Sequence, residues 1–472
     1  MRQDESNGII VLCIAYFSVL VGLAIYAGKK AKNAQEFSSA GRRIGMFVAM
    51  CTIVASEWGG GNVMGTASDA YSYGISAYIF PVSMGIGIFL LGLLLAQKYW
   101  NIEEVSMCRY IKARYSTRCE LLATILMLLS IMLVTGSQFK SGGLLAQSLF
   151  GWSPATAIII FAAIVAAYTC IGGLLGVAYN DTFNLIFGAC GLTVCLVAGL
   201  LNIGGIPAIM ETMTPERLDP RPFGDWVWAV DYLASSTFVM LAVPELIQRI
   251  WGCKTGKTAR RACTVGGIVY IVLGVMSLGL GLIAYVVLPN IDAGLAMPEL
   301  VMHLFPSLLG VVIILSVLAA LVSTADTMLL ICSTMIVEDL IRPFIKKEMS
   351  EKQHMLLLRI FIVIVAAITV SFATAFDRVL ALVMFSYYVY IGISTVFIFG
   401  RIWKGATENA AFWSMIISVV CAAIWQFGDL SYVVSYTTPG IVAIVTSFVP
   451  FFGISLIENR MNRKNGVVIL SN

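Results

Sequence analysis

Long apolar segments, separated by short polar loops, recur along the chain from residue 8 almost to its C-terminus. A helix of about 20 apolar residues is long enough to cross the hydrocarbon core of a bilayer. The pattern therefore predicts an all-α integral membrane protein with about 13 transmembrane helices. The predicted spans cover residues 8–27, 43–72, 76–97, 118–148, 154–172, 178–200, 226–251, 262–288, 307–341, 355–374, 377–400, 408–426 and 436–457.

The composition agrees with this class of protein. Of the 472 residues, 59% are hydrophobic and 12% are charged, whereas a soluble protein carries about 25% charged residues. The eleven cysteines form no C-x-x-C pair and the two histidines are far apart, so neither a disulfide framework nor a metal cluster is indicated. The net charge of +4 comes from basic residues in short loops, so we expect a lipid bilayer and no nucleic acid as partner.

The basic residues also predict the orientation of the chain, because cytoplasmic loops of membrane proteins carry the excess of lysine and arginine. Most of them fall in alternate loops and in the C-terminal tail. They include Lys29, Lys30, Lys32, Arg42, Arg43, Lys98, Arg109, Lys112, Arg114, Arg249, Lys254, Lys257, Arg260, Arg261, Arg342, Lys346, Lys347, Arg401, Lys404, Arg460, Arg463 and Lys464. Few, among them Lys140, Arg217 and Arg378, fall towards the other side. We expect a multi-pass plasma-membrane protein with its N-terminus outside and its C-terminus cytoplasmic.

Counting the spans predicts an internal symmetry. Spans two to six and seven to eleven form two blocks of five, and an odd number makes the second block start from the opposite face, as in an inverted-topology repeat. We expect residues 1–42 to form an N-terminal helix and cytoplasmic loop, and 43–200 and 226–400 the two repeats. Residues 201–225 would form an external linker loop, and 401–472 two C-terminal helices and a cytoplasmic tail.

One stretch inside the second span, "VASEWGGGNVMG" (54–65), opposes helix formation. Each of three consecutive glycines costs about 1 kcal/mol relative to alanine in a helix, and a charged side chain such as Glu57 costs about 2.5–3.5 kcal/mol at the bilayer centre. A helix unwound at mid-membrane is tolerated where its free backbone groups line a cavity or bind an ion. Close helix packing is the alternative reason for the glycines.

A second polar stretch lies in the ninth span, in "SVLAALVSTADTMLL". Ala320, Ser323 and Thr324 are spaced i, i+3 and i+4 and share one helical face. With the carbonyls of Ala55 and Trp58, this face would supply five neutral oxygens, which suit a hard cation such as sodium. The alternative is that both hydroxyls bond back to carbonyls of their own helix.

Four motifs resemble the sodium/solute symporter family, which includes sodium/proline, sodium/galactose, sialic acid and choline transporters. They are "ASEWGGGNVMGTASDAY", "YTCIGGLLGVAYNDTFN", "ELIQRIWGCKTGKTARRA" and "AALVSTADTMLLICSTMIVEDL", and the resemblance covers residues 8 to 457. It implies a LeuT-type five-plus-five inverted repeat that works by alternating access, with one helix before the core and two after it.

The resemblance also implies site residues. Matched by position, the family's sodium site falls on Ala55, Trp58, Ala320, Ser323 and Thr324. Asp181 matches an aspartate implicated in ion binding or release, although the motif here reads Asn-Asp-x-x-Asn in place of Thr-Asp-x-x-Gln.

Other side chains are candidates for binding the solute or an ion. Glu57 and Asn62 fall where relatives contact substrate or sodium, and Ser56 lies beside them. For Glu57 the alternative is a carboxylate that caps freed amides of a half-helix. Asp326 is either a second ion site or proton relay, or is paired with a nearby polar group.

Gln138 and Tyr387 complete the set of candidate solute contacts. Tyr387 belongs to the tyrosine cluster in "MFSYYVYIG", and such clusters also occur in ordinary core packing. Glu57 stands where the choline branch has a tryptophan, and Tyr387 where it has an aspartate, so choline is disfavoured as the solute.

The function expected from these observations is sodium-coupled import of a small polar organic solute, with sodium as the coupling ion and no organic cofactor. Glu57 favours an amino acid or another amine-bearing compound, because an unpaired buried charge is costly. Alternatives are a proton-coupled transporter of the same fold and a membrane solute sensor. No constellation of nucleophile and base is present at membrane depth, so we expect no enzyme. We expect one chain to be the functional unit.

Overall fold

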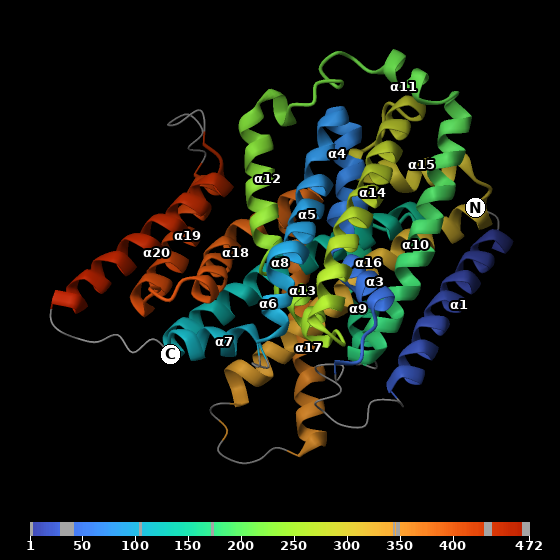
Figure 1. Cartoon of the computed structure of the whole chain (residues 1–472). Coiled ribbons are helices and arrows are strands. Elements are labelled where there is room, and N and C mark those ends of the chain that lie inside the picture. The colour runs from blue at the N-terminus through green and yellow to red at the C-terminus, as the bar shows by residue number, and fades with distance from the viewer. Residues whose placement is uncertain are drawn as a thin grey trace.

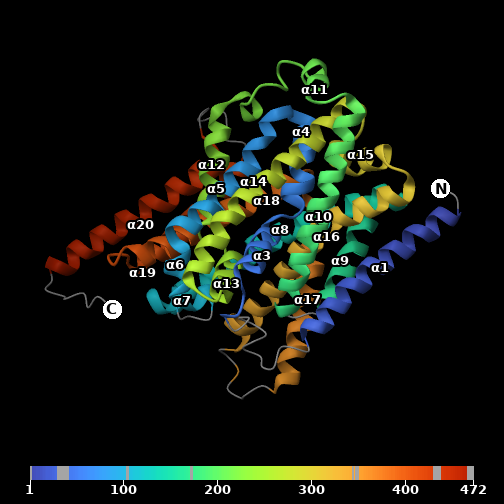
Figure 2. The same ribbon diagram turned by 45° about the vertical axis from the view of Figure 1, so that its right-hand side comes forward.

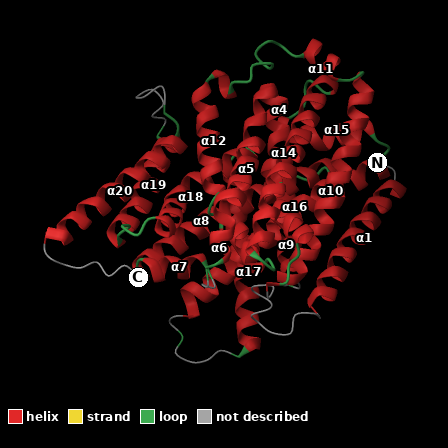
Figure 3. Cartoon of the chain, in the orientation of Figure 1, coloured by secondary structure: helices red, strands yellow, loops and turns green. Residues whose placement is uncertain are grey.

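The computed structural model of the protein describes residues 3–28, 42–102, 106–170, 174–342, 345, 350–428 and 437–464. Within these residues the regular structure is helical, apart from one isolated bridge between Ile44 and Cys253 (Figure 3). The described part contains ten helices that are long and apolar enough to cross a membrane. It also contains shorter apolar helices at Val11–Leu20, Met46–Glu57 and Pro154–Ala167. The prediction of an all-α membrane protein is thus confirmed, while the number of 13 crossings stays a prediction.

The helices follow one another in this order. The first half of the chain forms α1 (Gln3–Gly28), α3 (Met46–Glu57), α4 (Thr66–Tyr73), α5 (Ile79–Leu90), α6 (Ala96–Trp100), α7 (Met107–Arg114), α8 (Thr117–Phe150), α9 (Pro154–Thr169), α10 (Leu174–Ile203) and α11 (Ile206–Thr212). The second half forms α12 (Trp226–Met240), α13 (Pro244–Gly252), α14 (Gly256–Val287), α15 (Ala296–Leu304), α16 (Ser307–Met335), α17 (Glu351–Ala375), α18 (Val379–Ile402), α19 (Glu408–Phe427) and α20 (Pro439–Lys464). Short π-helical turns η4 (Leu91–Leu95) and η7 (Ile336–Ile341) continue α5 and α16, and η2 (Gly61–Gly65) leads into α4.

The bundle has a buried centre and two lipid-facing edges (Figures 1 and 2). Helices α8, α16 and α18 bury most of their surface, whereas α10, α17 and α20 expose most of theirs. Helix α1 lies along α10 at one edge, and α19 and α20 pack together at the other. Because lipid tails are as apolar as leucine, the exposed apolar side chains of the edge helices are expected in a membrane and need no protein partner.

The second predicted span is broken at its middle, as the glycines predict. Helix α3 ends at Glu57, and Trp58 leaves the helical conformation with φ −86° and ψ 71°. The chain resumes with the π turn η2 and then α4. The break therefore sits between two half-helices that together cross the bundle.

The seventh predicted span, 226–251, agrees with the apolar span Trp226–Gly252, but it is also broken in its middle, and the sequence interpretation did not anticipate that break. Helix α12 ends at Met240 and α13 begins at Pro244, with Val243 extended at ψ 140°. Proline has no N–H to donate and excludes the helical conformation from the residue before it, so Pro244 starts a new helix. Each predicted five-helix block thus begins with a broken helix.

Candidate functional site

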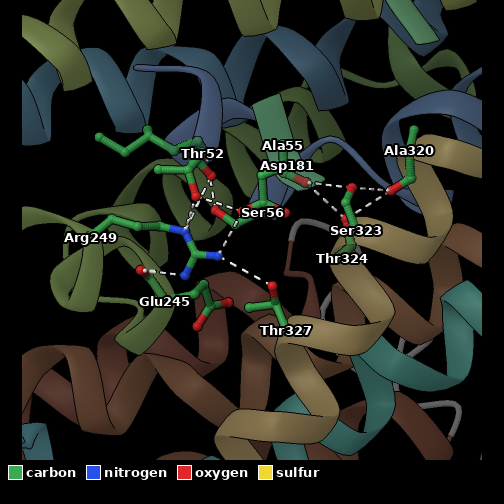
Figure 4. A network of polar contacts seen from close by, with 11 residues as sticks. Thr52, Ala55, Ser56, Asp181, Glu245, Arg249, Ala320, Ser323, Thr324 and Thr327 are labelled. Carbon is green, nitrogen blue, oxygen red and sulfur yellow. Dashed lines mark hydrogen bonds and ion pairs between the residues drawn. The ribbon is translucent and has the colours of Figure 1, made fainter. Parts of the chain in front are cut away.

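An oxygen cluster joins the break in α3 to the middle of α16 (Figure 4). The Thr324 hydroxyl donates to the carbonyls of Ala55 at 3.1 Å and Ala320 at 3.2 Å. The Ser323 hydroxyl lies 3.0 Å from the Ala320 carbonyl and 3.5 Å from that of Ala55. All four residues are buried. The cluster is neutral and rich in lone pairs, and it unites four of the five predicted sodium ligands.

The carbonyl of Ala55 is available because the helix ends two residues after it. In a continuous helix it would accept from the N–H of Gly59, four residues on. Here the Gly59 N–H bonds to the carbonyl of Glu57 at 3.1 Å. The break therefore frees the oxygen that Thr324 contacts.

Gln138 satisfies the other group that the break frees. Its side-chain oxygen accepts from the N–H of Gly60 at 2.6 Å. A Cβ on Gly60 would lie 2.5 Å from the Ser141 hydroxyl oxygen and 3.0 Å from the Ser137 carbonyl oxygen. The glycine thus lets the broken segment approach α8, and Gln138 holds it there.

Trp58 is the fifth predicted ligand, through its carbonyl. Its N–H bonds to the carbonyl of Val54 at 2.8 Å, and its ring is fully buried. The ring packs against Gly188 of α10, where a Cβ would lie 2.7 Å from a ring carbon. The packing anchors the residue beside the cluster, and the ligand role of its carbonyl stays a prediction.

A second polar cluster surrounds the guanidinium of Arg249, on the α13 side of the oxygen cluster (Figure 4). The guanidinium donates to the carbonyl and hydroxyl of Thr52 at 3.2 and 3.1 Å, to Asp181 at 3.2 Å and to the Thr327 hydroxyl at 3.2 Å. The Thr52 hydroxyl also donates to Asp181 at 2.5 Å. These bonds tie α13 to α3, α10 and α16. The sequence interpretation of Arg249 as a loop charge is wrong, because its side chain is only 5% exposed.

Asp181 and Asp326 both retain an oxygen without a partner. One carboxylate oxygen of Asp181 is held by Arg249 and Thr52, and the other makes no hydrogen bond to any residue that the structure describes. Asp326, next to Thr327, is buried with its Oδ1 likewise unbonded within the described chain. Both lie within electrostatic reach of Arg249.

The predicted solute contacts fall into two groups. Glu57 and Asn62 flank the break, and Glu57 Oε1 and both side-chain amide atoms of Asn62 are buried without a hydrogen-bond partner among the described residues. Tyr387 is buried and within electrostatic reach of Glu57. Ser56 and Gln138 are already engaged, because Ser56 donates back to the Ile53 carbonyl at 3.0 Å and Gln138 accepts from Gly60.

An ion pair at the opposite end of the bundle was not predicted. The guanidinium of Arg378, just before α18, donates to both carboxylate oxygens of Asp69 in α4, at 2.7 and 2.6 Å. The same guanidinium lies 5.0 Å from the Tyr73 ring centre and 5.5 Å from that of Phe223 in the 201–225 loop. Beneath the pair is a cavity of about 20 Å³ lined by Phe80, Tyr232 and Leu380 among others. The contacts hold α4, α18 and the loop together.

The sequence profile of the sodium:solute symporter family matches residues 37–418. The chain is 28% identical over 437 residues to sodium/proline symporter 2 of Staphylococcus saprophyticus, covering 88% of this chain and 85% of that one. It is 25% identical over 456 residues to the sodium/proline symporter of Escherichia coli, covering 89% and 88% of the two chains.

Solved structures share the fold. A sodium-coupled sialic acid symporter in a substrate-bound, outward-open state superposes with a TM-score of 0.81 at 18% identity, over 95% of this chain and 97% of that one. Mhp1, a nucleobase-cation-symport-1 family transporter, superposes with a TM-score of 0.65 at 14% identity, over 92% and 96% of the two chains. The expected LeuT-type fold is thereby confirmed.

Proposed function

Because the chain belongs to the sodium:solute symporter family, and is thus a sodium-coupled transporter of a small organic solute and not an enzyme, we propose that it imports an amino acid or another amine-bearing compound. Import would proceed by alternating access across the plasma membrane. The unbonded, buried Oε1 of Glu57 beside the helix break is the observation that supports this solute class. A protonated nitrogen would compensate a buried carboxylate that otherwise carries a large desolvation penalty.

The proposed sodium site consists of the carbonyl oxygens of Ala55, Trp58 and Ala320 and the hydroxyls of Ser323 and Thr324. Four of these oxygens already lie together, and a bound sodium ion would replace the hydroxyl-to-carbonyl hydrogen bonds between them. Asp181 and Asp326 are proposed to take part in ion passage, since each has a buried oxygen that no described residue hydrogen-bonds. Sodium bound here would hold α3 against α16.

The solute is proposed to bind at the break, against Glu57, Asn62 and Tyr387, with Ser56 and Gln138 shaping the backbone there. Glu57 and Asn62 extend from the same broken segment whose Ala55 carbonyl contacts the sodium site. A movement of that segment would therefore change the geometry of both the sodium site and the solute site. This physical connection supports coupling between sodium and solute, because each ligand would favour the same position of the segment.

Orientation and domain organisation complete the proposal. The N-terminus would lie outside and the C-terminus in the cytoplasm, with residues 43–200 and 226–400 as the two repeats. A broken helix at the start of each repeat supports this division. One chain would be the functional unit. In this orientation the Asp69–Arg378 pair lies on the external side and Arg249 on the cytoplasmic side.

Thermal unfolding of the detergent-purified protein in sodium chloride and in potassium chloride, crossed with a panel of amino acids, amines, organic acids and sugars, tests the proposal. A ligand that binds only the native state raises its stability by RT ln(1 + [L]/Kd). We expect an amine-bearing compound to raise the unfolding temperature more in sodium than in potassium. A solute that stabilises the protein equally in both salts would contradict the coupling.

A further inference from the structure

Two carboxylates lie beside the two helix breaks, one in each broken helix. Glu57 ends α3 at the first break, and Glu245 lies in the first turn of α13, directly after the second break. Glu245 and Arg249 lie within electrostatic reach of Glu57. The two breaks thus bring like charges together inside the membrane.

Each carboxylate has an oxygen that nothing in the described chain satisfies. Glu57 Oε1 and Glu245 Oε2 are both buried without a hydrogen-bond partner among the described residues, and the Glu245 side chain is only 5% exposed. Glu245 lies in the first turn of α13, and the N-terminus of a helix stabilises negative charge.

The charges around the breaks do not balance. Glu57, Glu245, Asp181 and Asp326 lie in electrostatic contact with Arg249. Among described residues, Arg249 is the one basic residue that is buried. Its guanidinium forms its ion pair with Asp181. A sodium ion at the oxygen cluster adds one positive charge and still leaves an excess of carboxylates. Buried carboxylates persist only when they are protonated or compensated by positive charge, and a cationic ligand is one way to compensate them.

Two tyrosines and a methionine lie near the two carboxylates. The Tyr270 hydroxyl lies 3.2 Å from the Glu57 carbonyl and 3.0 Å from the Met84 sulfur, and the Tyr387 hydroxyl lies 3.4 Å from the same sulfur. Tyr387 is in turn within electrostatic reach of both glutamates. Two tyrosine hydroxyls therefore converge on the Met84 sulfur beside the first break.

Asn62 provides an independent sign that a ligand belongs here. The residue is only 1% exposed, and within the described chain neither polar atom of its side chain makes a hydrogen bond of normal geometry, with the Tyr270 hydroxyl nearby. Its side chain faces Gly274 of α14, one turn from Tyr270, where a Cβ would lie 3.1 Å from the amide nitrogen. The Asn62 side chain and the Glu57 backbone therefore lie along neighbouring turns of α14, and the amide is available to bind a part of the solute that the carboxylates do not.

We propose that a protonated nitrogen of the transported solute, an ammonium or a guanidinium, binds between the carboxylates of Glu57 and Glu245, and that Glu245 is a specificity-determining residue. The inference rests on the proposed function, since it concerns the same solute site. It adds a second carboxylate, supplied by the other helix break. A solute bound in this way joins α3 to α13, so its arrival would draw the two breaks together.

The test uses isothermal titration of the purified full-length protein at saturating sodium with pairs of compounds that differ only in the protonated nitrogen. The pairs are amino acids with their 2-hydroxy acids, proline with tetrahydrofuran-2-carboxylate, putrescine with 1,4-butanediol and ethanolamine with ethylene glycol. We expect a protonated member to bind and its uncharged partner to bind at least tenfold more weakly. Binding of both members alike, or of no protonated compound, would overturn the inference.

Variants then assign the effect to Glu245. Glu245→Gln should weaken binding of the protonated compound at least tenfold and leave the thermal stabilisation by sodium unchanged. Glu299→Gln makes the same substitution in α15, where Glu299 accepts from Ser148 at 3.2 Å, and should change neither. Unchanged affinity in Glu245→Gln would contradict the assignment. Should that chain not unfold cooperatively, Glu57→Gln is measured in the same way with the same expectation.

The two proposals fail in different ways. If sodium does not raise the unfolding temperature of the wild-type protein, the sodium site and with it the proposed function are contradicted. If sodium does stabilise the protein but the solute that binds lacks a protonated nitrogen, this inference alone is contradicted.

Discussion

Arg249 shows how a single residue can hold several helices together beside the proposed ion site. Its guanidinium contacts Thr52, Asp181 and Thr327 from three different helices, in an environment where it is only 5% exposed. Removing one partner of a buried ion pair leaves the other charge uncompensated, which costs more than the pair contributes. The cluster is thus sensitive to the loss of either charge and less sensitive to the loss of both.

The first prediction follows from that asymmetry. Arg249→Gln should destabilise the protein by about 3–5 kcal/mol, because the buried Asp181 carboxylate loses its cation. The double variant Arg249→Gln/Asp181→Asn should recover part of that loss, as contacting residues couple by about 0.5–3 kcal/mol. Thermal unfolding in detergent measures both. Arg260→Gln, an exposed arginine in α14, is the control and should have little effect; additive losses in the double variant would contradict the pairing.

At the scale of the element, the broken helix depends on its glycines. A side chain at Gly60 would collide with Ser141 and with the Ser137 carbonyl, and it would push the segment away from Gln138. The Gly60 N–H would then lose its acceptor, and a buried unsatisfied donor costs about 1–3 kcal/mol. The position of the Ala55 carbonyl, and so the sodium site, depends on the same segment.

Gly60→Ala should therefore lower the unfolding temperature and weaken the stabilisation by sodium together. The measurement is thermal unfolding across a sodium titration at constant ionic strength. Gly22→Ala is the matched control, because Gly22 in α1 is exposed and a Cβ there meets nothing within 4 Å. If Gly60→Ala binds sodium with the wild-type affinity, the sodium site does not depend on the position of the broken segment, and the prediction is contradicted.

The same element scale shows what the sequence can predict. Three consecutive glycines after Glu57 are a local signal, and the break there is confirmed. Pro244 is an equally local signal for the second break, and it was overlooked inside an otherwise apolar span. The burial of Arg249 has no local signal, because it is decided by Asp181, which lies 68 residues away in the sequence. Likewise, Asp69 and Arg378 are 309 residues apart, and only the packing of α4 beside α18 pairs them.

At the scale of the whole molecule, polar contacts join the helices at both ends of the bundle. Asp69 and Arg378 connect α4 to the start of α18 at one end, and the Arg249 cluster connects α3, α10, α13 and α16 at the other. A transporter that works by alternating access must open these two sets of contacts in turn. The structure presents both sets intact.

Breaking the Asp69–Arg378 pair should open that end of the molecule. In a background without the native cysteines, a cysteine at Phe80, which lines the cavity below the pair, should react with a polar thiol reagent several-fold faster when Asp69→Asn is added. The charge-reversed double variant Asp69→Arg/Arg378→Asp should return the rate towards the starting value. A labelling rate that Asp69→Asn leaves unchanged would show that the pair does not close this face.

The central claim is that sodium binds where the break in α3 meets α16, and equilibrium binding of radioactive sodium to the purified protein tests it most directly. The wild-type chain should bind sodium saturably. Ser323→Ala/Thr324→Ala should reduce the affinity at least tenfold, because two of the proposed oxygens are gone. Ser333→Ala removes a buried hydroxyl from the same helix that donates to the Leu330 carbonyl at 2.9 Å, and should bind like wild type. Sodium binding that survives in the double variant would contradict the account.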